Sequence, residues 1–380
     1  MTDPTTYLEE PTALEMTNAV RALRAAVPDR GLFAFVCEKD APSVATLQEV
    51  AVAEACPLVG GIVPGLVVHG GFRRRGVLLS SFDGGAPRRI VAMPRVDGKF
   101  ADAAISELAD FVTANASPDG TDSLLLLVDT TLGDIGEIVD RLYQEVGDMV
   151  GYVGTCVGSE TFVRMPCVFD ERTFAAGALV AVLLRGHPGA SMAHHYRGGD
   201  ALWVATTTTG GRIAAIDGRP AFDVYRELVQ REYGVAIDRE NFYRYGVHFP
   251  LALNRGQGEP LVRIPIQVED DGSVFCSGDV PENTLLSVVR AIPRDDLGAA
   301  EAVGAGACAG VDVGSAVLTF YCAGRFLHLD EAAATREITA LEAAIHPRPL
   351  FGVLSLGEIG SPKQTYPAFH NATIVAMPWS

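Results

Sequence analysis

The residues best suited to chemistry lie in three short segments near the C-terminus. FYCAGR, GEIG and FHNAT supply a thiol, a guanidinium, a carboxylate, an imidazole and two neutral polar groups, on Cys322, Arg325, Glu358, His370, Asn371 and Thr373. At the ends of neighbouring strands, such groups can line a polar pocket. Because an arginine suits a carboxylate and a glutamate suits an amino group, we expect Arg325 and Glu358 to bind an amino-acid-like zwitterion.

Other roles are open for the same residues. Cys322 and His370 could form a nucleophilic pair, because an imidazole can hold a nearby cysteine as its thiolate. Cys322 could instead be a buried structural cysteine, and Arg325 and Glu358 could form an ion pair that closes two turns. The motifs GxSxG, HExxH and SxxK do not occur. We therefore expect a protein that is not an enzyme, and a Cys-dependent enzyme is the alternative.

Two adjacent histidines, His194 and His195 in SMAHHYRGG, form a second candidate site. In a strand they would point to opposite faces, so they would rarely chelate one metal ion, and we expect no metal site. A single histidine can ligate haem iron, and His194, His195 or His370 would then be the axial ligand. A hydrogen-bonded structural histidine is the simpler interpretation. We expect no cofactor, with haem as the alternative.

Paired glycines follow three apolar strands. CPLVGGIVPG, DMVGYVGTCVG and RPLFGVLSLGEIG align on Gly60, Gly151 and Gly352. Such turns let backbone N–H groups approach a ligand, or they simply permit close strand packing. The sequence has neither GxGxxG nor GxxxxGKS, so nucleotide binding has no specific support. Because three similar turns could converge on one pocket, we assign further ligand contacts to Gly60, Gly61, Gly154, Cys156 and Gly357.

The elements that must position these residues recur along the chain. Residues 31–66, 123–160 and 316–360 each have the pattern of an apolar strand, a helix and a second strand with glycines. This repetition predicts an α/β fold with mixed sheets under helical cover, in two halves. The C-terminal strand 373–377 is continuously apolar, which predicts a central position that Pro378 ends.

The middle of the chain is richer in strands and has no low-complexity linker. We place a boundary near Gly218, because a helix signal begins at Pro220 directly after it. The expected division is therefore an N-terminal extension over residues 1–30 and two domains over 31–218 and 219–380.

Charge and cysteine content narrow the function classes. The 380 residues carry a net charge of −17, which disfavours binding to nucleic acid. No run of about 18 apolar residues and no signal-peptide pattern occurs, so we expect a cytoplasmic protein without membrane insertion. The seven cysteines include no CxxC pair, which disfavours both a disulfide framework and a zinc site.

Several segments resemble the FIST family. AEACPLVGGIVPGLVVHGGFRRRGVLLSSF is similar to its N-terminal region, and GRIAAIDGRPAFDVYREL is similar to the start of its C-terminal region. FYCAGR, GEIG and FHNAT look like the family's Cys-x-Gly-Arg, Gly-Glu-Ile and His-Asn-x-Thr signature, and the order holds across most of residues 31–378. In place of the family's His-Gly-Trp-like segment stands His194-His195-Tyr196.

The resemblance implies a prokaryotic sensory protein that binds a small molecule such as an amino acid. One branch of the family binds haem and reports nitric oxide. No kinase, cyclase or chemoreceptor output region fits in this chain, so we expect a signal to a separate protein. The resulting hypothesis is a soluble sensor that binds an amino-acid-like metabolite in a pocket between its two halves.

Overall fold

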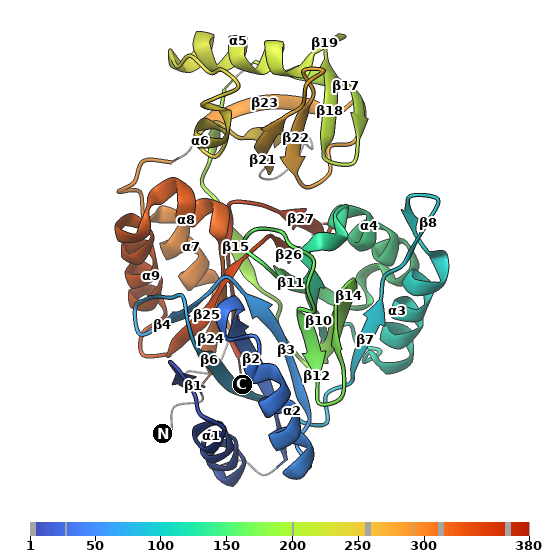
Figure 1. Ribbon diagram of the computed structural model, residues 1–380, viewed down its shortest axis with the longest axis vertical. Coiled ribbons are helices and arrows are strands. Elements are labelled where there is room, and N and C mark those ends of the chain that lie inside the picture. The colour runs from blue at the N-terminus through green and yellow to red at the C-terminus, as the bar shows by residue number, and fades with distance from the viewer. Residues whose placement is uncertain are drawn as a thin grey trace.

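The computed structural model describes residues 5–26, 29–199, 201–254, 260–290, 292–310, 315–361 and 366–379. Its elements form two units, a large body built from three sheets and a smaller barrel at one end of the body (Figure 1). Along the body, the chain runs three times through one order of elements, which is strand, helix, strand, helix, strand, hairpin, strand. We call each pass a repeat.

The element bounds follow this order. The first repeat has β1 (Thr5–Leu8), α1 (Ala13–Ala26), β2 (Arg30–Cys37), α2 (Ser43–Ala53), β3 (Leu58–Val63), β4 (Gly65–Val68), β5 (Gly71–Arg73) and β6 (Val77–Asp83). The second has β7 (Arg88–Ala92), β8 (Arg95–Val96), β9 (Lys99–Phe100), α3 (Asp102–Asn115), β10 (Ser123–Asp129), α4 (Ile135–Val146), β11 (Gly151–Val157), β12 (Val168–Asp170), β13 (Phe174–Ala175) and β14 (Ala178–Leu184). The third has β15 (Ser191–Ala193), α7 (Gly298–Ala307), β24 (Ala316–Cys322), α8 (Ala323–Leu329), α9 (Glu331–Ile345), β25 (Leu350–Ser355), β26 (Glu358–Gly360), β27 (Ala368–His370) and β28 (Ile374–Trp379).

Each repeat builds the centre of one six-stranded sheet. The three sheets have the orders β1-β6-β2-β3-β12-β13, β7-β14-β10-β11-β26-β27 and β15-β28-β24-β25-β4-β5. In every sheet the two middle strands are parallel, and their neighbours on either side are antiparallel to them. Parallel strands need a crossover connection, and the helices α2, α4 and α8–α9 provide it.

The hairpins are exchanged around the body. The hairpin of the first repeat, β4–β5, pairs with the third sheet, β12–β13 of the second repeat pairs with the first sheet, and β26–β27 of the third pairs with the second. The exchange therefore forms a closed ring. Where the repeats meet, the Gly158 N–H donates to the Ile62 carbonyl at 2.7 Å and the Cys156 N–H donates to the Gly357 carbonyl at 2.8 Å.

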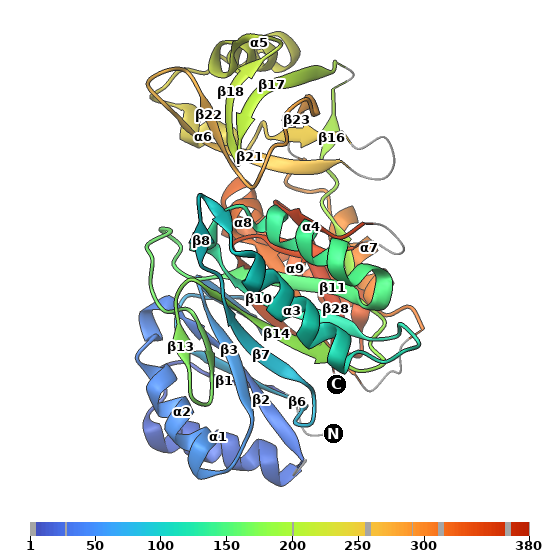
Figure 2. The same ribbon diagram turned by 90° about the vertical axis from the view of Figure 1, so that its right-hand side faces the viewer.

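Side chains of the parallel strands are buried on both faces, as their apolar sequences predict. Alternate residues of a strand point to opposite faces. In β10, Leu125 and Leu127 pack in the central core where the sheets face one another, whereas Leu124, Leu126 and Val128 pack under α3 and α4. Figure 2 shows these two helices lying across β10 and β14. The α/β class and the mixed sheets with helical cover are thus confirmed.

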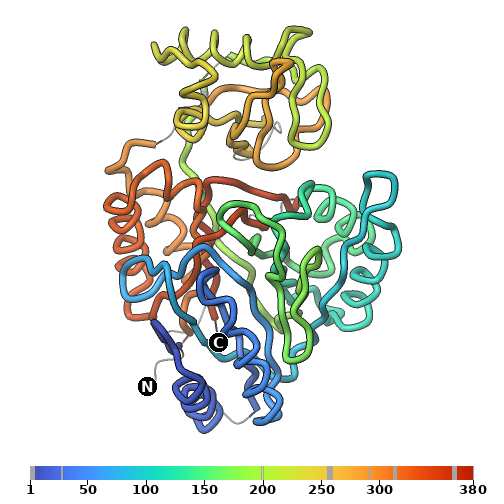
Figure 3. The backbone as a smooth tube through the Cα atoms, viewed as in Figure 1, coloured from blue at the N-terminus to red at the C-terminus, as the bar shows by residue number. Residues whose placement is uncertain are grey.

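The barrel is inserted into the third repeat between β15 and α7. It contains β16 (Arg197–Gly198), β17 (Trp203–Thr209), β18 (Arg212–Ile216), β19 (Arg219–Pro220), α5 (Ala221–Tyr233), α6 (Phe242–Gly246), β20 (Leu251–Leu253), β21 (Leu261–Val268), β22 (Val274–Ser277) and β23 (Leu285–Arg290). The antiparallel pairings run β23-β17-β18-β22-β21-β20 and return to β23, which closes the ring. The tube in Figure 3 shows the chain passing from the body to the barrel and back. Gly218 lies inside this unit, so residues from both sides of the expected boundary build the barrel.

The three predicted strand–helix–strand segments are confirmed as β2-α2-β3, β10-α4-β11 and β24-α8-α9-β25. One detail of their alignment is wrong, because the partner of Gly60 and Gly352 is Gly154, not Gly151. A Cβ atom on Gly60, Gly154 or Gly352 would lie 2.1, 2.3 or 2.0 Å from a backbone carbonyl oxygen of the neighbouring parallel strand. At Gly151 the nearest atom would be a serine hydroxyl at 3.3 Å.

The C-terminal strand lies inside the third sheet, between β15 and β24, as predicted. The expectation that Pro378 ends it is wrong. The strand continues through Trp379, which pairs with Ala316. The Trp379 indole N–H also donates to the Ser81 carbonyl at 2.9 Å, and this contact anchors the strand end to β6.

The three equivalent glycines give a test of the repeat. We expect Gly60→Ala, Gly154→Ala and Gly352→Ala each to destabilise the protein, because the added methyl group would press on a backbone carbonyl that has no flexible end to move. Overpacking of this kind costs about 1–3 kcal/mol or more. Gly71→Ala is the control, since its Cβ would meet only the end of the Arg73 side chain, at 3.5 Å. Urea unfolding measures the difference, and three variants as stable as Gly71→Ala would contradict the assignment.

Candidate functional site

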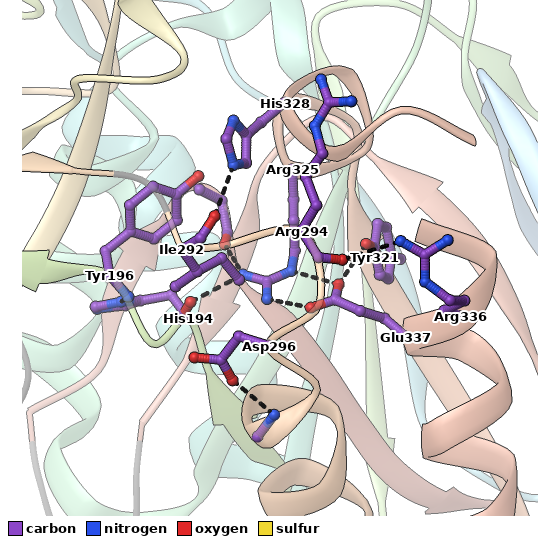
Figure 4. Close-up of polar contacts among 12 residues, drawn as sticks. His194, Tyr196, Ile292, Arg294, Asp296, Tyr321, Arg325, His328, Arg336 and Glu337 are labelled. Atoms are coloured by element: carbon purple, nitrogen blue, oxygen red, sulfur yellow. Dashed lines mark hydrogen bonds and ion pairs between the residues drawn. The ribbon is translucent and has the colours of Figure 1, made fainter. Parts of the chain in front are cut away.

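A buried ion pair joins α8 and α9 of the body, and Figure 4 shows its hydrogen bonds. Arg325 on α8 is fully buried, and its Nε and Nη2 atoms donate to the Glu337 carboxylate on α9 at 2.7 and 2.5 Å. The Tyr321 hydroxyl donates to the same carboxylate at 2.5 Å. The partner of Arg325 is therefore Glu337 rather than Glu358. Removing one member of such a buried pair typically costs about 3–5 kcal/mol, because the other charge stays buried without compensation.

The remaining guanidinium nitrogen of Arg325 joins two distant segments. Its Nη1 atom donates to the His194 carbonyl at 2.8 Å and to the Ala372 carbonyl at 3.2 Å. His194 lies where the chain leaves the body for the barrel, and Ala372 lies between β27 and β28. Arg325 thus fixes the path into the barrel and the turn next to Asn371 and Thr373. A guanidinium that is used in this way has no face left for a ligand carboxylate.

Glu358 and the two cysteines of the predicted site lie close together in a closed environment. Glu358 is fully buried at the start of β26 and accepts a short hydrogen bond from the Ser355 hydroxyl. Burial raises the pKa of Glu358 to about 8, although Ser355, the Cys322 thiol and the Thr373 N–H oppose this shift. A Cβ atom on Gly357 would lie 3.6 Å from the Cys156 sulfur. The structure therefore brings Cys156, Cys322, Glu358 and Thr373 together.

The surroundings of Cys322 favour the thiol over the thiolate. Burial, and secondarily the nearby Glu358 carboxyl, raise the pKa of Cys322 to about 12. Its sulfur accepts a hydrogen bond from the Ala372 N–H at 3.1 Å. Activated cysteines need the opposite shift, so this geometry does not support a nucleophile.

The other predicted residues are distributed around this cluster. His370 pairs with Glu358 across β26 and β27 and is almost fully buried. The Asn371 side-chain amide is hydrogen-bonded to the Ser277 hydroxyl of the barrel at 3.1 Å. Gly60 and Gly61 lie in β3 of the first sheet and pack against Phe169 and Val157. They belong to the interior of the body and do not line an open pocket with Arg325.

The two adjacent histidines have different surroundings. Both ring nitrogens of His194 are engaged, because Nε2 lies 3.0 Å from the Pro260 carbonyl and Nδ1 accepts from the Tyr196 N–H at 2.9 Å. His195 has a positive φ of 57° and is partly exposed. A Cβ atom on Gly298, at the start of α7, would lie 2.9 Å from the His195 ring. His195 also borders an open space, whereas His194 is buried.

That space is a cleft of about 660 Å³ between the body and the barrel. Both chain segments that join the two units line it, together with α6 of the barrel and α8 of the body. The polar lining consists of His195, Arg197, Tyr245, His248, Arg290, Arg294, Asp296 and His328. A volume of this size suits a small metabolite. We call this feature the junction cleft.

Two histidines close one side of the junction cleft. His248 of the barrel and His328 of α8 place their Nδ1 atoms 2.5 Å apart. His328 Nε2 lies 3.2 Å from the Ile292 carbonyl, so Nε2 carries the proton and Nδ1 accepts from His248. Burial lowers the pKa of both rings, that of His328 to about 4. The pair therefore joins barrel and body in its neutral form.

Sequence reasoning missed Glu337 and most of the junction cleft. Glu337 had one usable signal, since it lies on the apolar face of α9 with Ala334, Ile338 and Leu341. An acidic residue on such a face needs a buried cationic partner. Among the described residues, no group of histidine, cysteine and acidic side chains is arranged to hold a metal ion.

Comparison with known families places both parts of the chain. A family model described as the FIST N domain matches residues 31–219, and one described as the FIST C domain matches residues 221–361. FIST domains are associated with small-ligand sensing in signal transduction. A search of curated proteins finds no match. In the described part of the chain, every helix is too short or too polar to cross a membrane.

The buried carboxyl of Glu358 predicts a pH dependence of stability. Its pKa is about 8 in the folded protein against an ordinary value of 4.5, so the folded state keeps a proton that the unfolded state releases in this range. The contribution of Glu358 to stability therefore falls as the pH rises from about 4.5 to about 8.

We expect Glu358→Gln to become more stable relative to the wild type across this range, because glutamine needs no proton to be neutral. The measurement is the free energy of unfolding of both proteins at several pH values. Glu107→Gln, which removes an exposed carboxylate, serves as the control. A difference between wild type and Glu358→Gln that does not change with pH would show that Glu358 is ionised in the folded protein.

Proposed function

The chain belongs to the FIST family, and on that premise we propose that it is a sensory protein with its ligand site in the junction cleft. The ligand is a small, amino-acid-like metabolite, and the output passes to a separate partner protein. The observation that carries this proposal is the position of the cleft, which has one wall on the body and the other on the barrel.

The two walls give the cleft a means of signalling. A ligand shifts a conformational equilibrium only if it binds one arrangement more tightly than another. A molecule that contacts Asp296 on the body and Tyr245 on the barrel favours the arrangement in which both can reach it. Ligand binding then changes the orientation of the barrel relative to the body, and a partner protein can recognise that difference.

The cleft replaces the pocket that was expected from Arg325 and Glu358. Both of these side chains are fully buried, and Arg325 is saturated by Glu337 and two carbonyls. The cleft offers the same two kinds of contact to an amino-acid-like ligand that were expected from Arg325 and Glu358. Arginines of the cleft suit its carboxylate, and Asp296 suits its amino group.

We propose that the protein acts without haem and without a catalytic cysteine. His194 is a poor axial ligand because both of its ring nitrogens are hydrogen-bonded. The raised pKa of Cys322 argues against a thiolate nucleophile.

A thermal-shift screen of the full chain tests the proposal. The panel contains amino acids, small organic acids and haem, and a ligand should raise the melting temperature by mass action. We expect Pro293→Trp, which puts a bulky side chain on the exposed rim of the cleft, to abolish the shift. Pro118→Trp makes the same change at an exposed loop of the body and should respond like the wild type.

Two results would overturn this assignment. One is a panel in which no compound changes the melting temperature. The other is a shift that Pro293→Trp retains in full, since the compound would then bind elsewhere. A haem spectrum with a Soret band that His195→Ala removes would favour the haem alternative instead.

A further inference from the structure

Two arginines stand side by side on the wall of the junction cleft. In the antiparallel pair β16–β23, Arg197 is directly opposite Arg290. Residues opposite one another in such a pair point to the same face, with Cβ atoms about 5 Å apart. Like charges in this position repel and destabilise the pairing. Both side chains are solvent-exposed, so solvent weakens this repulsion without removing it, and both guanidinium groups are accessible to a ligand.

No acidic side chain in the described part of the chain forms an ion pair with Arg197 or Arg290. Asp296, the one carboxylate among the described residues that line the cleft, accepts a hydrogen bond from the Gly298 N–H. The third arginine of the cleft, Arg294, is paired with Asp330.

The same two arginines also border a second hollow. An open groove of about 800 Å³ continues along the barrel from Arg197 and Arg290 to Trp203. There the guanidinium of Arg231 lies 5.2 Å from the Trp203 ring, and Arg231 also pairs with Glu232 at 3.1 Å. The two arginines thus stand where the cleft and the groove meet, and a molecule that enters either hollow can reach both.

We propose that Arg197 and Arg290 together bind an anionic group of the ligand, a carboxylate or a phosphate. An anion between the two guanidinium groups accepts charge-assisted hydrogen bonds from both and removes their mutual repulsion. In an acidic protein, this pair gives the cleft a local positive charge that draws anions from solution. The inference rests on the proposed function, because it names the chemistry of the ligand in the same cleft.

The test uses inorganic phosphate, succinate and the neutral isostere succinamide, with the ionic strength kept constant by chloride. We expect phosphate or succinate, but not succinamide, to raise the melting temperature of the full chain. Phosphate and succinate serve as separate arms, which distinguish a phosphate ligand from a carboxylate ligand. Arg197→Gln and Arg290→Gln should each weaken binding about tenfold or more, because a charged hydrogen-bond donor is lost.

The unliganded variants add a second readout. Because the pair repels, Arg197→Gln and Arg290→Gln should melt at the same temperature as the wild type or higher. Arg89→Gln on the body, whose partner is the exposed Glu107, gives the same change in net charge and should keep the anion response.

Three results would overturn the inference. They are no shift with either anion, an anion shift that both arginine variants retain, and variants that melt below the wild type without anion. A neutral compound whose shift Pro293→Trp abolishes would leave the cleft as the ligand site while removing the anion from it. The failure of this inference is thus distinguishable from the failure of the proposed function.

Discussion

The structure around the junction of body and barrel depends on the buried pair of Arg325 and Glu337. A guanidinium without solvent must find a partner for each of its donors, and Arg325 does so with one carboxylate and two backbone carbonyls. Those contacts hold α8 against α9, the segment that leads into the barrel, and the turn after β27. The pair therefore positions two walls of the junction cleft, since α8 carries His328 and the leading segment carries His195 and Arg197.

The body gives this arrangement a rigid base. Each of the three sheets receives a hairpin from another repeat, so no repeat can complete its sheet alone. The barrel is joined to the body by two chain crossings, by the contact of His248 with His328, and by packing around β27, where Arg263 donates to the Phe369 carbonyl and Ala372 packs with Val262 and Ile264. A firm body with a separately folded unit at its edge is a suitable construction for a protein that responds to a small molecule.

The sequence pattern predicted those parts of the fold that are determined by residues close together in the chain. Apolar strands, helical periodicity and glycines identified all three strand–helix–strand units, because these features are fixed by a few neighbouring residues. The exchange of hairpins was out of reach, since nothing in β4–β5 specifies which sheet it joins. The partner of Arg325 was also missed, because Glu358 and Glu337 look alike as isolated acids and only burial geometry separates them. The cleft combines residues near positions 195, 248, 290 and 328, and these meet only after the barrel has folded back on the body.

The central claim is that a small ligand binds between the body and the barrel. Hydrogen–deuterium exchange of the full chain, with and without a compound that raises its melting temperature, tests this most directly. The account predicts slower exchange in the segments that line the cleft, at residues 194–199, 242–249, 285–290, 292–296 and 323–329, and no change in α1 and α3. Protection centred on β3, β11 and β26 instead, with these cleft segments unchanged, would contradict it and return the ligand to the interior of the body.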